Sequence, residues 1–135
     1  MARTAQFDEF RGRHRRHELL DGDDELSGWI KQRNELFLAA DAAALQGLRE
    51  VVAWAVNSGF YTQAAANDFA SKADAQLVGH ARAHGLTVVS HERAQDTPTK
   101  VKIPNACTAM GVAHCDVFDV LRGEGARFVL APSAP

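Results

Sequence analysis

The spacing of apolar residues changes at residue 86, and this change constrains the fold more than any other feature of the sequence. Before it, apolar positions recur at helical spacing, which predicts helices over about 7–20, 24–36, 41–57, 62–72 and 74–84. After it, short apolar runs predict strands at 86–90, 112–115 and 126–130, with two short helices between them, at 104–111 and 117–122. Strands that alternate with helices predict an α/β fold with a parallel sheet covered on both faces.

The length and composition are those of one ordinary globular domain. Of the 135 residues, 46% are hydrophobic and 24% are charged, which excludes collagen-like and generally disordered classes. We expect a single domain over residues 1–130 and a frayed C-terminal tail over 131–135. Lys and Arg number 15 against 17 Asp and Glu, so any nucleic-acid contact has to come from a local basic patch.

The sequence also predicts a cellular compartment. Its longest apolar run, Val51–Val56, is far shorter than the roughly 20 residues that a membrane span needs. The N-terminus lacks the apolar stretch of a secretory signal, so we expect a cytoplasmic protein with no membrane partner. Cys107 and Cys115 form no CxxC pair, and we expect both thiols to be reduced and at least partly buried.

Three acidic residues are candidate ligands for a divalent metal. In open parallel sheets, ligands bind beyond the carboxyl ends of the strands, and Glu92 follows the strand predicted at 86–90 almost directly. Its carboxylate suits Mg²⁺, which prefers oxygen ligands, although a solvated loop residue is the alternative. Asp74 begins the preceding helix, where a cap or a partner of the helix dipole is the alternative. For Glu18, on the first predicted helix, the alternative is a surface acid.

Other polar and aromatic residues favour simpler roles. His80 and His84 have the i, i+4 spacing of zinc-binding histidines, but a solvated helix end is the preferred interpretation. Trp29 lies in an apolar helical pattern that favours core packing over base stacking. Asp116 and Asp119 are expected to begin a helix rather than to bind a ligand.

Five stretches of the chain also fit a known pattern when they are taken together: ELLDGDDELSGW at 18–29, ADAQLV at 73–78, LTVVSHE at 86–92, KIPNAC at 102–107 and DVFDVLR at 116–122. From about His17 to Leu130 the chain thereby resembles a bacterial PIN-like family, related to the VapC-type toxin ribonucleases. The resemblance implies a PIN-like three-layer α/β/α fold with a parallel sheet.

The resemblance also implies a chemistry, because PIN domains cut single-stranded RNA with Mg²⁺ or Mn²⁺ held by three or four acids. Glu18 matches the acid of the family's early helix, Asp74 the acid that begins the later helix, and Glu92 the acid just past the following strand. These three are therefore the implied catalytic and metal-binding residues. A metal held by clustered carboxylates activates water and neutralises charge on the scissile phosphate. The implied partners are single-stranded RNA, a cognate antitoxin protein and a second copy in a homodimer.

The chain departs from the PIN pattern at its beginning. PIN domains start with a short apolar strand that ends in an Asp followed by a small hydroxyl residue, and nothing before Glu18 matches this. We therefore expect the N-terminal strand and its Asp to be missing, nuclease activity to be impaired, and the chain to be marginally stable and prone to associate. The alternative is a non-catalytic PIN-like protein that binds an antitoxin or RNA. A zinc hydrolase built on His80 and His84 is a third hypothesis.

Overall fold

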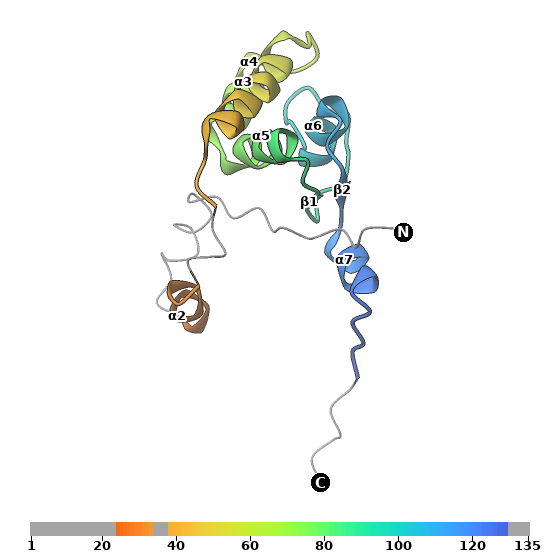
Figure 1. The fold of residues 1–135 in the computed structure, drawn as a ribbon. Helices are drawn as coiled ribbons and strands as arrows, with labels where there is room; N and C mark the ends of the chain where they lie inside the picture. Colours follow the sequence, from red (N-terminus) through yellow and green to blue (C-terminus); the bar gives the residue numbers. More distant parts are fainter. Residues whose placement is uncertain (1–23, 34–37, 130–135) are drawn as a thin grey trace.

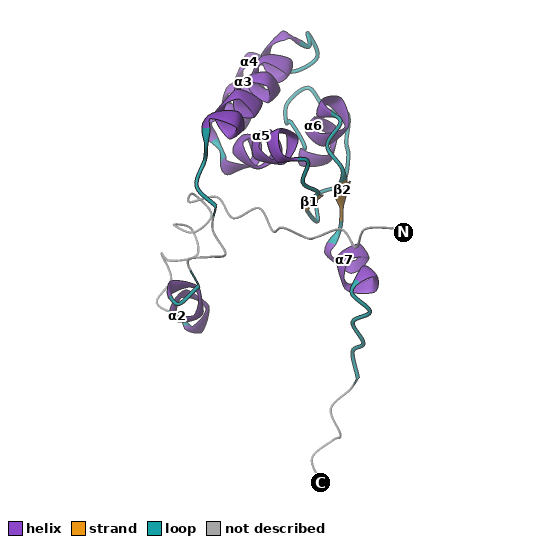
Figure 2. Cartoon of the chain, in the orientation of Figure 1, coloured by secondary structure: helices purple, strands orange, loops and turns teal. Residues whose placement is uncertain are grey.

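The computed structural model describes residues 24–33 and 38–129 (Figure 1). This part of the chain contains six helices and two short strands, in the order α2 (Glu25–Lys31), α3 (Ala42–Asn57), α4 (Gln63–Ser71), α5 (Ala73–His84), β1 (Val88–Val89), α6 (Ile103–Met110), β2 (His114–Cys115) and α7 (Val117–Gly123). Helices make up nearly all of the regular structure (Figure 2). The helix predicted over 7–20 and the residue Glu18 lie outside the described residues.

Local signals place most helix ends where the sequence predicts them. Asp24, Asp41 and Thr62 each accept a hydrogen bond from a backbone N–H three residues on, and so cap α2, α3 and α4. Gly85 and Gly111 end α5 and α6 in the left-handed conformation, with φ of 65° and 66°. α2 is shorter than predicted, because it ends at Lys31.

α5 is the central helix and packs against α3, α4 and α6 (Figure 1). Its crossing with α3 is very close: a Cβ atom on Gly47 would lie 2.0 Å from the carbonyl oxygen of Gly79. Without side chains at these two positions, the helices bring a continuous set of buried residues together. The largest of these with almost no exposure are Val51, Val78, Val88 and Cys107.

The strands form a small parallel sheet, as the sequence predicts, in a fold of mixed helix and strand. Val88 lies opposite His114 and Val89 opposite Cys115, so each strand is shorter than its apolar run. The prediction of a strand at 126–130 is wrong over residues 126–129, which pair with no described strand. Phe128 and Val129 are 81% and 88% exposed, because the chain leads away from the sheet after α7 (Figure 1).

The prediction that Trp29 packs in the core is also wrong. Its side chain is 46% exposed, and the Arg33 guanidinium lies 4.1 Å from the centroid of its ring. α2 buries Ser27 and Ile30 instead, on its other side. The helical spacing of this segment is thus confirmed, whereas the placement of Trp29 in the core is not.

The cysteines are placed as expected. Cys107 on α6 is buried, Cys115 on β2 is partly buried, and both are free thiols. Burial raises the pKa of the Cys107 thiol to about 12. Within residues 24–33 and 38–129, no helix has the length and apolar character to span a membrane.

Candidate functional site

The first candidate site lies beyond the carboxyl end of β1, where Glu92 approaches the start of α6. The backbone N–H of Glu92 donates to Ser90 Oγ at 3.0 Å, which turns the chain just after the strand. Glu92 Oε2 then accepts a hydrogen bond of 2.8 Å from the backbone N–H of Ile103, the first residue of α6. A carboxylate is stabilised at this position because the N-terminus of a helix carries partial positive charge. Glu92 thus caps α6, and the sequence did not predict this role.

The second carboxylate oxygen of Glu92 faces a lysine. Lys100 Nζ lies 3.8 Å from Glu92 Oε1, and the side chain of Glu92 is 27% exposed. An ion pair of this length at a half-open surface adds little to stability, but it places a positive charge beside the carboxylate. Glu92 Oε1 is therefore the carboxylate oxygen that lies next to the Lys100 ammonium, on a partly exposed side chain.

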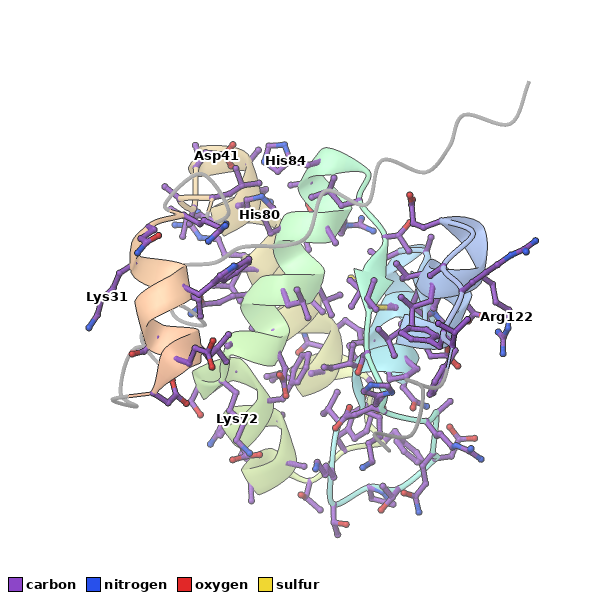
Figure 3. The ribbon with its side chains drawn as sticks, turned by 90° about the horizontal axis from the view of Figure 1, so that it is seen from below. Lys31, Asp41, Lys72, His80, His84 and Arg122 are labelled. Carbon is purple, nitrogen blue, oxygen red and sulfur yellow. The ribbon has the colours of Figure 1, made fainter. Side chains whose placement is uncertain are left out.

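Asp74 lies in the first turn of α5, partly buried, and Lys72 occupies the position just before that helix (Figure 3). Lys72 Nζ donates to Asp68 Oδ2 at 2.6 Å. The pKa of Lys72 is raised mainly by this hydrogen bond, and further by the negative charges of Asp68, Asp74 and Glu92. Asp74 and Glu92 come from different elements, yet both act on the same ammonium group.

The charges of two of the three predicted site residues, Asp74 and Glu92, both contribute to the raised pKa of Lys72, while Glu18 lies outside the described residues. In the part of the chain that the structure describes, no group of three His, Cys, Asp or Glu side chains is arranged to hold a metal ion. Asp116 and Asp119 form a reciprocal capping box at the start of α7, which confirms that they begin a helix.

A second polar cluster lies between α3 and α5, and it corrects a prediction. His80 is only 4% exposed, so it does not belong to a solvated helix end. Its ring centroid lies 4.6 Å from that of His84, whose Nε2 is 2.9 Å from Asp41 Oδ2 (Figure 3). The sequence spacing of the histidines was the available signal, but the contact with Asp41, which also caps α3, spans 43 residues.

His80 and Asp41 in this cluster both have lowered pKa values, for different physical reasons. The pKa of His80 is lowered by burial and by the positive charge of His84, against the smaller effect of the Asp41 charge. The pKa of Asp41 is lowered mainly by the hydrogen bond from the Ala44 backbone and then by the bond with His84. The cluster thus combines a neutral buried histidine with an ionised, capped aspartate, which is a structural arrangement rather than a reactive one.

A groove of about 610 Å³ lies between α3, the end of α5 and the loop after α6. Its charged groups are all paired: the Arg82 guanidinium binds the Glu50 carboxylate and also donates to the Met110 carbonyl oxygen at 2.6 Å. These contacts link three helices and hold the pKa of Glu50 below its usual value, chiefly through the hydrogen bond from Arg82. Neither Asp74 nor Glu92 lines the groove. The charged residues of this groove therefore connect helices and have no evident role in binding a ligand.

Comparison with known proteins connects the chain to one family. A family model described as "Domain of unknown function (DUF4411)" matches residues 11–128. No curated protein and no solved structure matches the chain.

Proposed function

This chain belongs to the DUF4411 family, and we propose that it acts as a PIN-like, metal-dependent endoribonuclease of a toxin–antitoxin system. The proposal includes a PIN-like three-layer α/β/α fold, Mg²⁺ or Mn²⁺ as the cofactor and single-stranded RNA as the substrate. Glu18, Asp74 and Glu92 are its metal ligands, and a cognate antitoxin protein is its partner.

One observation carries the proposal: the Glu92 carboxylate is held just beyond β1 by the Ile103 N–H and lies 3.8 Å from Lys100 Nζ. Its charge and that of Asp74, on α5, both help to raise the pKa of Lys72. Glu92 also lies beyond the carboxyl end of a parallel strand, which is where ligand sites of such sheets occur. Carboxylates of this kind are the ligands that the proposal needs, because Mg²⁺ is commonly held by one or two protein carboxylates together with waters and substrate phosphates.

The residues around the acids have roles in the same proposal. The metal, when bound, activates water and neutralises charge on the scissile phosphate. Lys100, whose ammonium lies 3.8 Å from Glu92, and Lys72, which precedes Asp74 in the chain, attract the RNA backbone, since lysines bind phosphate as point charges. The hydrogen bond from Ile103 to Glu92 Oε2 holds the carboxylate in one orientation and leaves Oε1 on the open side.

The same contacts favour a second candidate, a non-catalytic protein that binds RNA or an antitoxin. Glu92 Oε2 is bonded to the Ile103 N–H and Oε1 faces Lys100, so this carboxylate has a structural role without any metal. In that case the lysines remain a surface for RNA, and no bond is cleaved.

Cleavage of a labelled single-stranded RNA with Mn²⁺ tests the first candidate against the second. Asp74→Asn and Glu92→Gln remove the charge and keep the shape, and the new Gln retains an oxygen that can accept from Ile103. We expect each to lower the cleavage rate and the Mn²⁺ affinity by at least about 10-fold, while the fold stays intact.

Asp68→Asn is the matched control, because it removes a charge from the same lysine without removing a proposed ligand. It is expected to cleave like the original chain. RNA binding without cleavage at any Mn²⁺ concentration supports the second candidate. Cleavage that both Asp74→Asn and Glu92→Gln leave unchanged contradicts the proposed site.

A further inference from the structure

Residues 117–129, which we call the C-terminal arm, consist of α7 and the extended segment after it, and they project from the helices α3–α6 (Figure 1). No residue of α7 is buried, and Phe118, Phe128 and Val129 are 57%, 81% and 88% exposed. Apolar surface in contact with water is unfavourable, so an arm with three such side chains is expected to gain from a partner.

The chain itself offers a matching surface, the far edge of β2. Val88 N–H donates to the Ala113 carbonyl and Ser90 N–H to the Cys115 carbonyl, so these two carbonyls point toward β1. Because backbone groups alternate along a strand, the N–H and C=O of His114 point the other way. Among the described residues no strand pairs with this edge. An edge of this kind is a template for another strand.

The end of the C-terminal arm has a sequence that suits a strand beside β2. Residues 126–129 read Ala-Arg-Phe-Val and belong to none of the described helices and strands, and Phe and Val favour strands. Arg127 gives this segment a positive charge, and Asp116, an acid, follows β2 directly. The pKa of Asp116 is lowered, chiefly by the backbone hydrogen bond from Asp119, so its carboxylate is charged at neutral pH.

The connection between β2 and α7 decides whether the arm can reach the β2 edge of its own chain or only that of a second chain. It consists of Asp116 alone, whereas such connections usually have about 2–6 residues. The capping box between Asp116 and Asp119 also fixes the direction in which α7 leaves the strand. In the structure α7 and the segment after it lead away from their own sheet (Figure 1), and a short hinge of this kind favours exchange between chains.

We propose that two copies of this chain exchange their C-terminal arms, so that residues 126–129 of each add a strand to the far edge of β2 in the other. The exchange is reciprocal, which gives a closed two-fold dimer and covers both exposed edges. It does not depend on the proposed nuclease function, because the arm contains none of the proposed ligands.

The oligomeric state of the full chain tests the proposal, by sedimentation or by light scattering after gel filtration. We expect a dimer that dissociates on dilution. The double variant Phe128→Asp, Val129→Asp loses almost no contact within its own chain and is expected to be a folded monomer with an unchanged circular dichroism spectrum. Leu45→Asp is the matched control, since Leu45 is a half-exposed apolar residue on α3, and it should remain dimeric. A monomeric original chain, or a dimeric double variant, overturns the proposal.

A variant with a longer connection between β2 and α7 distinguishes an exchange of arms from a simple contact between the arms of two chains. Insertion of a few Gly and Ser residues between Cys115 and Asp116 lets the arm reach the edge of its own β2. We expect this variant to be monomeric, with the amides of 126–129 as protected from hydrogen exchange as they are in the dimer. A variant that stays dimeric shows that the arms are not exchanged.

Discussion

At the scale of single residues, His80 places an ionisable ring inside the interface between α3 and α5. Its surroundings favour the neutral form, because burial and the nearby His84 both lower its pKa. In the unfolded chain the same ring takes up a proton near pH 6.5. The unfolded state therefore binds more protons than the folded state in that range, and stability must fall as the pH drops through it.

We predict that the free energy of unfolding, measured in urea, falls as the pH is lowered from about 7 to about 5. His80→Gln removes the group that titrates and should remove most of this slope. Asp41 acts in a separate range, since its pKa is lowered from 3.8 and its contribution is lost only at more acidic pH. His91→Gln changes an exposed loop residue and should keep the original slope. An unchanged slope in His80→Gln contradicts the prediction.

Cys107 gives a second prediction at this scale. Its side chain is fully buried on α6 and its pKa is raised to about 12, so almost no thiolate is present at neutral pH. In a Cys115→Ser variant, the remaining thiol should react with a disulfide reagent only as fast as the protein opens, and urea should speed the reaction sharply. The Cys107→Ser variant, which keeps the partly exposed Cys115, should react faster in the folded state. If the two variants react with the reagent at equal rates in the folded state, Cys107 is not protected by burial as described.

At the scale of elements, the crossing of α3 and α5 depends on two residues without side chains. A Cβ on Gly47 would lie 2.0 Å from the Gly79 carbonyl oxygen, and one on Gly79 would lie 2.5 Å from the Leu48 nitrogen. Both contacts are with backbone atoms, so a rotamer change cannot relieve them. A methyl group there forces the two helices apart and loosens the core between them.

We predict that Gly47→Ala and Gly79→Ala each destabilise the protein by about 3 kcal/mol or more, at the upper end for overpacked cores. Gly28→Ala is the control, because the middle of α2 has open space around the added methyl group. Alanine should stabilise that helix by about 0.5–1 kcal/mol. Urea denaturation followed by circular dichroism measures all three. A neutral effect at Gly47 and Gly79 would show that the helices do not cross so closely.

At the scale of the whole molecule, burial is concentrated around α5 and falls toward the ends of the described chain. The main buried cluster draws on α3, α4, α5 and α6 and contains no residue of α2 or α7. Hydrogen exchange should follow the same order, because amides in well-packed elements open only with the global fold. Under dilute conditions we expect the slowest exchange in α5 and α3 and much faster exchange in α7.

Raising the protein concentration separates packing from assembly. Protection in α3 and α5 should stay constant, whereas protection of residues 117–129 should rise as dimers form. Mass spectrometry of exchanged peptides measures both regions in one experiment. Constant exchange in the arm would mean that it has no partner in solution.

The candidate site was only partly predictable from the residues. Asp74 at a helix start and Glu92 after a strand could be identified, since both follow from local spacing. The cap that Glu92 provides for α6 could not, because it depends on where Ile103 lies after an intervening loop. The shared influence of both acids on Lys72 likewise required the folded chain.

The sequence by itself determined where most helices begin and end, because the signals act within one turn: Asp41 and Thr62 cap the backbone three residues on, and Gly85 accepts the left-handed conformation. Only the tertiary structure decided which faces are buried and which strands find a partner. His80 is enclosed and Trp29 is exposed although both lie in helical patterns, and residues 126–129 pair with no described strand despite a strand-like sequence. Burial and strand pairing depend on neighbours supplied by distant parts of the chain, which local spacing does not encode.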